Sequence, residues 1–159
     1  MKRNAKVRIV YFGSCKTPFI KAGIERFHRW IRPYLSMEAI ALPSGGDIHR
    51  VGARGIQARE EELFFKRFSR EQKGVLLCEE GENPDSQAFA TWLENQISLA
   101  AYPLFVIAGY AGPGEQLKQW ANTTLSLSRM TWTHEMAYLL LMEQLFRAMK
   151  IIRKEPYHY

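Results

Sequence analysis

Three short apolar runs constrain the fold of this chain more than any other feature of its sequence. Residues 6–12 (KVRIVYF) alternate and are rich in β-branched side chains, which predicts a strand. Residues 74–78 (GVLLC) and 103–108 (PLFVIA) are apolar throughout, as expected of strands buried on both faces of a sheet. Residues 37–42 and 123–127 are further candidate strands. Because segments of helical spacing separate these runs, we predict an α/β fold with a mainly parallel sheet flanked by helices.

The segments between the strands predict helices over 16–34, 59–68, 86–99 and 115–121, with Ser86 as a cap of the third. Residues 43–56 contain four glycines, and we predict a mobile loop there. The sequence shows no linker and no internal repeat. We therefore expect residues 1–159 to form a single domain.

The last helix is predicted over 135–150, after Thr133 as its cap, and it is apolar around nearly its whole circumference. A helix of this kind is buried on all sides. In a chain of 159 residues, a homodimer interface would supply part of that cover. The alternative is a helix at the centre of the chain's own core.

The charge of the chain is unevenly distributed. Residues 1–73 carry 16 Lys and Arg against 7 Asp and Glu, whereas residues 74–159 carry 6 against 9. A polyanion such as RNA or DNA binds a basic surface of this kind through phosphate contacts and counterion release. A basic surface that is simply solvated is the alternative. The sequence contains only two cysteines and no signal peptide, which predicts a cytoplasmic protein. Because it has no apolar run of 18 residues, we expect no helix that spans a membrane.

Two loops in the second half are candidates for ligand binding. Residues 109–114 (GYAGPG) follow a predicted strand, where α/β proteins bind ligands and glycine lets the backbone approach a ligand closely. Residues 125–134 combine hydroxyl side chains with apolar ones that suit an adenine ring. A tight turn and a buried connection are the structural alternatives. The four histidines do not have the spacing of metal ligands, so we expect no metal site. The sequence also lacks the GxSxG motif of serine hydrolases, so we do not expect that chemistry.

The second half also carries a set of short motifs in a specific order and spacing. They are AGYAG at 108–112, SLSRMT at 126–131, His134, EQLFRA at 143–148 and PYH at 156–158. Together these motifs resemble the RlmH-type ribosomal RNA large-subunit methyltransferases of the SPOUT superfamily. The resemblance spans the chain and is strongest from about residue 74.

The resemblance implies a C-terminal trefoil knot, an obligate homodimer and S-adenosylmethionine as cofactor. The implied substrate is N3 of a pseudouridine in a hairpin loop of 23S rRNA, methylated on the assembled ribosome. By position, the residues implied in cofactor binding are Leu77, Gly109, Ser128, Arg129, Met130, Thr131, Trp132 and Thr133.

The candidate catalytic residues are His134, Arg147, Tyr157 and His158. The N3 proton has to leave, and His134, His158 or a water molecule with Arg147 stabilising the anion are the alternatives for that step. Tyr157 is suited to hold or stack on the base.

Tyr138 and Tyr159 stand where the family usually has basic residues. These departures keep a second hypothesis open, in which the chain is a non-catalytic RNA- or ribosome-binding homologue. A methyltransferase with a different RNA target is a third.

Overall fold

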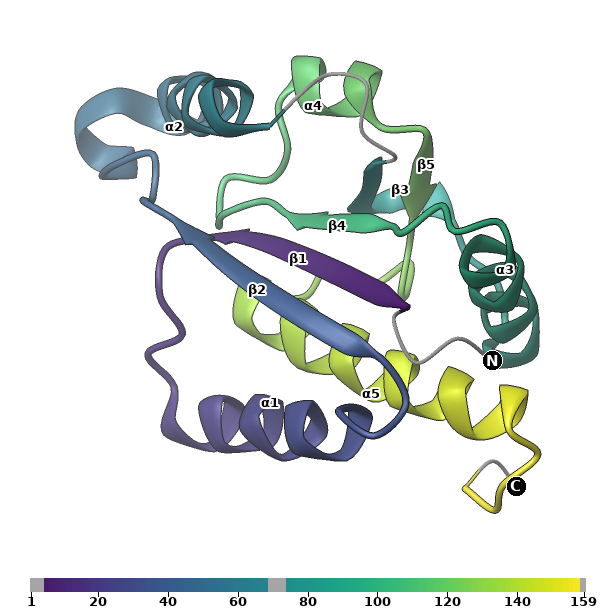
Figure 1. Ribbon diagram of the computed structural model, residues 1–159. Coiled ribbons are helices and arrows are strands. Elements are labelled where there is room, and N and C mark those ends of the chain that lie inside the picture. Colours follow the sequence, from purple (N-terminus) through teal and green to yellow (C-terminus); the bar gives the residue numbers. More distant parts are fainter. Residues whose placement is uncertain (1–4, 69–73, 158–159) are drawn as a thin grey trace.

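The computed structural model describes residues 5–68 and 74–157 (Figure 1). Within these residues, five strands form one sheet in the order β2-β1-β4-β3-β5, and every neighbouring pair is parallel. The strands are β1 (Lys6–Phe12), β2 (Ser36–Leu42), β3 (Gly74–Glu82), β4 (Leu104–Ile107) and β5 (Thr123–Leu125). The predicted α/β fold with a parallel sheet flanked by helices is confirmed.

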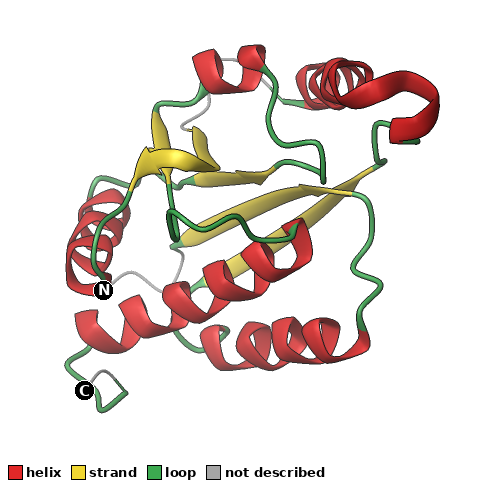
Figure 2. Cartoon of the chain, turned by 180° about the vertical axis from the view of Figure 1, so that it is seen from behind, coloured by secondary structure: helices red, strands yellow, loops and turns green. Residues whose placement is uncertain are grey.

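Helices cover both faces of the sheet, as the view from behind in Figure 2 shows. One face carries α1 (Pro18–Ile31), α3 (Ser86–Ser98) and α5 (His134–Ile152), and the other carries α2 (Ile48–Arg67) and α4 (Glu115–Trp120). This arrangement explains the continuous apolar strands. In β4, Phe105 and Ile107 enter the core beneath α1, α3 and α5, whereas Leu104 and Val106 enter the core beneath α2 and α4.

Helix α5 lies against the sheet and packs on both α1 and α3. Thr133 caps it as predicted, because its hydroxyl oxygen accepts the backbone N–H of Met136 at 3.2 Å. Seven of its residues are buried within the single chain. The chain's own core therefore accounts for much of the apolar pattern, and the homodimer stays a prediction.

The prediction of a loop over residues 43–56 is wrong, because α2 begins at Ile48. The side chain of Asp47 caps the helix by accepting the N–H of His49 at 2.8 Å. Gly52 has φ +69°, and two helical segments meet there at a kink. A left-handed residue of this kind is accessible to glycine at little cost. The glycines thus permit a bent helix here.

Two element boundaries in the middle of the chain also differ from the prediction. Strand β3 continues to Glu82, beyond the predicted end at residue 78. The cap of α3 is Asp85, which accepts the N–H of Ala88 at 2.7 Å, and Ser86 is the first helical residue. Across the described parts of the chain, no helix has the length and apolar character needed to cross a membrane.

Candidate functional site

A cavity of about 910 Å³ opens at the carboxyl ends of β3, β4 and β5. This is the edge where open parallel sheets bind ligands. Residues of β3, the ends of β4 and β5 and the segments that follow β4 and β5 line it, together with the first residues of α5. Of the predicted cofactor residues, seven line the cavity: Leu77, Gly109, Ser128, Met130, Thr131, Trp132 and Thr133. Arg129 is exposed and is not among the lining residues.

A buried carboxylate holds the first glycine of the β4–α4 loop. Glu60, on α2, is only 1% exposed and accepts the backbone N–H of Gly109 at 3.1 Å and that of Gly45 at 3.4 Å. Burial raises the pKa of Glu60, and these two N–H donors partly offset that effect. A Cβ on residue 109 would overlap the Glu60 carboxylate, so this close approach requires glycine.

Two further side chains of α2 fix the rest of the same loop. The amide nitrogen of Gln57 donates to the carbonyl of Ala111 at 2.9 Å, and Glu61 accepts the N–H of Leu117 at 3.0 Å. Glu61 is also buried. Helix α2 therefore sets the position of the loop from its first glycine to the start of α4.

The segment after β5 is bound to the end of β3. The N–H of Ser126 donates to the carbonyl of Glu82 at 2.7 Å, and the amide of Asn83 donates to the carbonyl of Ser126 at 2.8 Å. Further along, the hydroxyl of Thr131 donates to Glu79 at 2.6 Å. These contacts hold the predicted adenine-binding segment as one wall of the cavity.

His134 is the candidate catalytic residue that the structure places at the cavity, as the first residue of α5. The next residue, Glu135, accepts the N–H groups of Lys16 at 2.7 Å and Thr17 at 3.2 Å. The hydrogen bonds to Thr17 and Lys16 lower the pKa of Glu135. The β1–α1 connection is thereby joined to the same wall, and Thr17 also lines the cavity.

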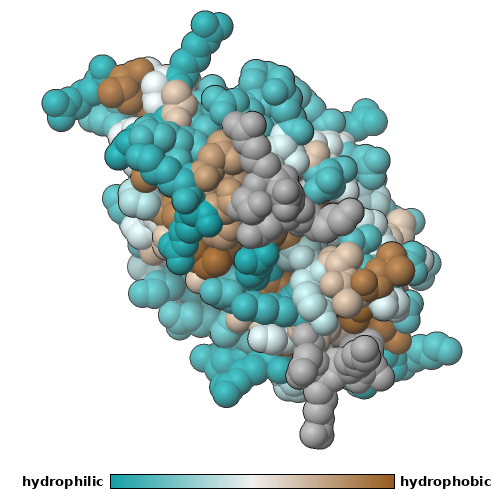
Figure 3. Space-filling model, turned by 45° about the horizontal axis from the view of Figure 1, so that its top comes forward, coloured by the Kyte–Doolittle hydropathy of each residue, from teal (hydrophilic) through white to brown (hydrophobic). Residues whose placement is uncertain are grey.

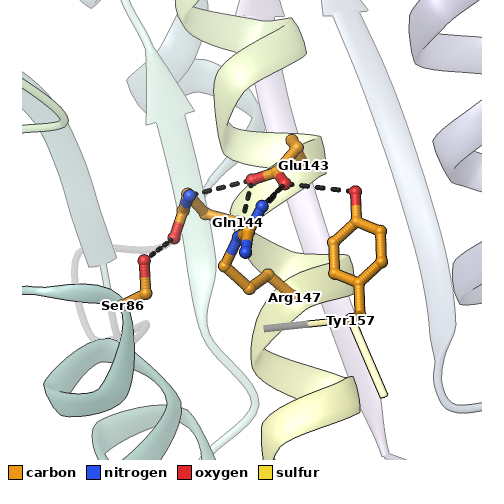
Figure 4. A network of polar contacts seen from close by, with 5 residues as sticks. All are labelled: Ser86, Glu143, Gln144, Arg147 and Tyr157. Atoms are coloured by element: carbon orange, nitrogen blue, oxygen red, sulfur yellow. Dashed lines mark hydrogen bonds and ion pairs between the residues drawn. The ribbon is translucent and has the colours of Figure 1, made fainter. Parts of the chain in front are cut away.

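Arg147 and Tyr157 lie together at the other end of α5, in the polar network of Figure 4. Glu143 is its centre, accepting from Arg147 Nε at 3.1 Å and from the Tyr157 hydroxyl at 3.2 Å. The Arg147 guanidinium lies 4.8 Å from the centre of the Tyr157 ring. Gln144 links Glu143 to Ser86 at the start of α3, through bonds of 2.8 Å each.

The Glu143 hydrogen bond raises the pKa of Arg147, and burial followed by the Glu143 charge raises that of Tyr157. Thirteen residues separate His134 from Arg147 on the helix, which corresponds to roughly 20 Å. Within one chain, the structure does not bring these two candidates together. His158 lies outside the described residues.

Comparison with known proteins identifies the family. Residues 5–158 match the family model described as predicted SPOUT methyltransferase. The chain belongs to the SPOUT methyltransferase family. The ribosomal RNA large subunit methyltransferase H of Dictyoglomus thermophilum is 36% identical over 154 residues, covering 96% of this chain and 99% of that protein. The protein of the same name from Kosmotoga olearia is 38% identical over 154 residues, with the same two coverages.

A solved structure has the same fold as this SPOUT chain. The crystal structure of a probable methyltransferase from Bordetella pertussis Tohama I superposes with a TM-score of 0.55, at 10% sequence identity. The match covers 92% of this chain and 95% of that one.

Tyr138, at which the resemblance implied a basic residue, is buried in the hydrophobic core. Its ring packs against Tyr11 with the ring centroids 5.0 Å apart. Burial strongly raises the pKa of its hydroxyl, so the side chain is neutral. Tyr138 therefore acts as a packing residue. Its burial argues against the hypothesis that a cation has been lost from an RNA-facing surface at this position.

Sequence reasoning missed Glu60 and Glu61, the two carboxylates that support the cavity of this SPOUT chain. A signal was present in the spacing of Ile56, Glu60 and Phe64, which fall four residues apart on one buried helix face. A carboxylate within an apolar stripe needs a buried partner. That partner is the backbone of the glycine loop.

Proposed function

We propose that this chain transfers a methyl group from S-adenosylmethionine to large-subunit ribosomal RNA. The main support is the convergence of two sequence-distant segments, residues 108–113 and 127–134, on a single cavity. They overlap residues 109–114 and 125–134, the two loops that the sequence indicates as candidates for ligand binding. The family match and the names of the full-length relatives point to the same activity.

The residues of the cavity fit S-adenosylmethionine. Its volume is within the usual range for small-molecule sites, about 300–1,000 Å³. Leu77, Ile107, Leu125 and Leu127 offer an apolar wall for an adenine ring. The loop at Gly109 and the segment from Ser128 to Thr133 bring backbone groups that suit its polar edges. When bound, the cofactor supplies an electrophilic methyl group on a sulfonium.

The proposed acceptor is N3 of a pseudouridine in a hairpin loop of 23S rRNA, on the assembled ribosome. A loop base is already partly unstacked, so its extrusion into a cavity costs little. N3 has to lose its proton as the new N–C bond forms. Among the described candidate catalytic residues, His134 lines the cavity, and its imidazole has a ring nitrogen that is suited to accept that proton. His158, and water with Arg147 stabilising the anion, remain the alternatives.

A homodimer would complete this site. Arg147 is about 20 Å along α5 from His134, and Arg147 and Tyr157 both contact Glu143, which is not among the residues that line the cavity. A second copy is needed for them to reach a reacting base, if they act in catalysis as proposed. Those lysine and arginine residues of the first half that lie on the side of the cavity mouth would then add to the RNA-binding surface.

We also propose that the C-terminal segment is threaded as a trefoil knot. The contacts that support it are those of Ser126, which passes against Glu82 and Asn83 after β5. From there the chain continues to α5, on the face of the sheet opposite to α4.

The test is methyl transfer from labelled S-adenosylmethionine to ribosomes that lack the modification, with separated subunits and free rRNA as comparisons. We expect label on a large-subunit pseudouridine, with assembled ribosomes as the acceptor. Cofactor binding without label on any acceptor would instead indicate a binding-only homologue. Label on another RNA would indicate a methyltransferase with a different target.

A further inference from the structure

The N-terminal part of α2, with the turn before it, projects from the body of the molecule. We call residues 46–54 the α2 tip. All nine are exposed, and among them Ile48 and Val51 have exposed fractions of 39% and 52%. Figure 1 shows this part of α2 at the far left, and in Figure 3 brown atoms lie among teal ones at the same corner. The described residues leave this apolar surface uncovered.

The α2 tip is anchored to the rim of the cavity. The Tyr110 hydroxyl donates to the carbonyl of Gly46 at 2.6 Å and accepts the N–H of Ile48 at 3.1 Å. Tyr110 lines the cavity, and its exposed fraction is 49%. The tip and the cavity mouth are therefore parts of one continuous surface.

The tip carries positive charge that nothing in the described chain neutralises by an ion pair. Arg50 and Arg54 are exposed, and neither forms a salt bridge within residues 5–68 and 74–157. His49 is exposed beside them. The one carboxylate of the tip, Asp47, is engaged by the N–H of His49 as the helix cap.

We propose that the α2 tip is a contact surface for the RNA substrate of the neighbouring cavity, an inference that rests on the proposed function. Arg50 and Arg54 are suited to phosphates, and exposed Ile48, Val51 and the Tyr110 ring are suited to sugars and an unstacked base. A base that enters the cavity has to pass its rim, where Tyr110 joins the tip to the opening. The RNA strand on either side of that base then meets the tip.

Charge favours RNA over a second copy of this chain as the occupant. In a two-fold symmetric contact centred on the tip, the patch faces its own copy, so Arg50 and Arg54 would oppose the same residues of the second chain. Phosphates instead complement these cations, and their binding releases counterions.

The test compares two double variants of the full-length chain. Arg50→Gln/Arg54→Gln removes two cations from the tip, and Lys66→Gln/Arg67→Gln removes two from the opposite end of the same helix. For each protein we measure the affinity for ribosomes at several salt concentrations by filter binding, the KM for ribosomes in methyl transfer, and the affinity for S-adenosylmethionine by calorimetry.

For the tip variant we expect ribosome affinity to fall about tenfold, and the slope of log affinity against log salt to decrease by about one for each cation removed. KM for ribosomes should rise by a similar factor. Cofactor affinity should remain within about twofold, because neither arginine lines the cavity. The control variant should keep wild-type ribosome affinity within about twofold.

Unchanged ribosome affinity in the tip variant, or an equal loss in the control, would overturn the proposal. A change in sedimentation on Val51→Asp would also overturn it and assign the tip to a contact between copies. Because ribosome binding is measured without turnover, a wild-type chain that binds ribosomes but transfers no methyl group would count against the proposed activity alone.

Discussion

The carboxylate of Glu60 accepts the backbone N–H of Gly109 across 3.1 Å, at the wall of the cavity. Glu60 stands on α2, and Gly109 lies in the loop that follows β4. The same carboxylate also accepts from Gly45, so one buried group joins the loops after β2 and β4. The shape of the proposed cofactor site thus depends on a side chain that is not itself among the lining residues.

Replacement of Glu60 by glutamine should disturb this junction. A carboxamide offers one acceptor oxygen, whereas Gly109 and Gly45 use both oxygens of the carboxylate, so one N–H would face an NH2 group. We expect the free energy of unfolding to fall by about 1–3 kcal/mol and cofactor affinity to fall about tenfold. Denaturant unfolding and calorimetry measure the two effects.

Glu62→Gln is the matched control, because Glu62 is exposed on the same helix and pairs only with Arg59 and Lys66 among the described residues. It should leave cofactor affinity unchanged. Equal cofactor affinity of Glu60→Gln and wild type would remove Glu60 from its role in positioning the loop.

Substitution of Gly109 by alanine should act through the same contact. The added Cβ overlaps the Glu60 carboxylate, and overpacking of this kind costs about 1–3 kcal/mol. The single variants Glu60→Ala and Gly109→Ala both alter this one contact. The double variant Glu60→Ala/Gly109→Ala should therefore lose less stability than the sum of the losses of the two single variants. A double-mutant cycle by denaturant unfolding checks this, and strictly additive losses would argue against a shared contact.

The contact of Glu135 with the β1–α1 connection should depend on pH. The pKa of Glu135 is lowered in the folded chain. The contact therefore stabilises the fold at pH values above the ordinary carboxyl pKa, and this stabilisation is lost as the pH falls through the lowered pKa. Glu135→Gln should therefore lower the free energy of unfolding by about 1 kcal/mol at pH 7. The difference from wild type should narrow as the pH falls below about 4.5. An equal difference at pH 7 and pH 3 would contradict this dependence.

If the active site is shared between subunits, two inactive chains should complement each other. His134→Ala and Arg147→Ala should each lower turnover by about 10²-fold or more. After co-expression, about half of the dimers contain one chain of each variant. In such a mixed dimer one of the two sites has both His134 and Arg147, so about a quarter of wild-type turnover should return. Recovery no greater than the sum of the two separate variants would place His134 and Arg147 in the same subunit's site or outside the mechanism.

The order and type of the elements were accessible from the sequence because the local patterns agree with the global fold. Strand β4 is apolar throughout since helices cover both of its faces, and Thr133 caps α5 as its position suggested. The two loops that line the cavity could also be singled out, since glycines and hydroxyl residues follow the strand ends, whereas their binding of the cofactor stays a prediction.

The bent start of α2 was not accessible in the same way. Local rules treat the glycines of residues 43–56 as a loop, whereas Asp47 and Gly52 together permit two helical segments to meet. The pairing of Glu60 with Gly109 joins positions 49 residues apart, and no periodicity predicts a contact of that separation. The predicted last helix already sets His134 and Arg147 about 20 Å apart, but only the fold shows that the first residues of α5 line the cavity.

Amide hydrogen exchange of the wild-type chain, with and without S-adenosylmethionine, tests the assignment of the cavity most directly. We expect the cofactor to slow exchange in residues 108–114 and 127–134, and to leave the outer turns of α1 and α3 unchanged. Protection confined to other segments, or none at a cofactor concentration shown to saturate binding, would contradict the placement of the methyl donor in this cavity.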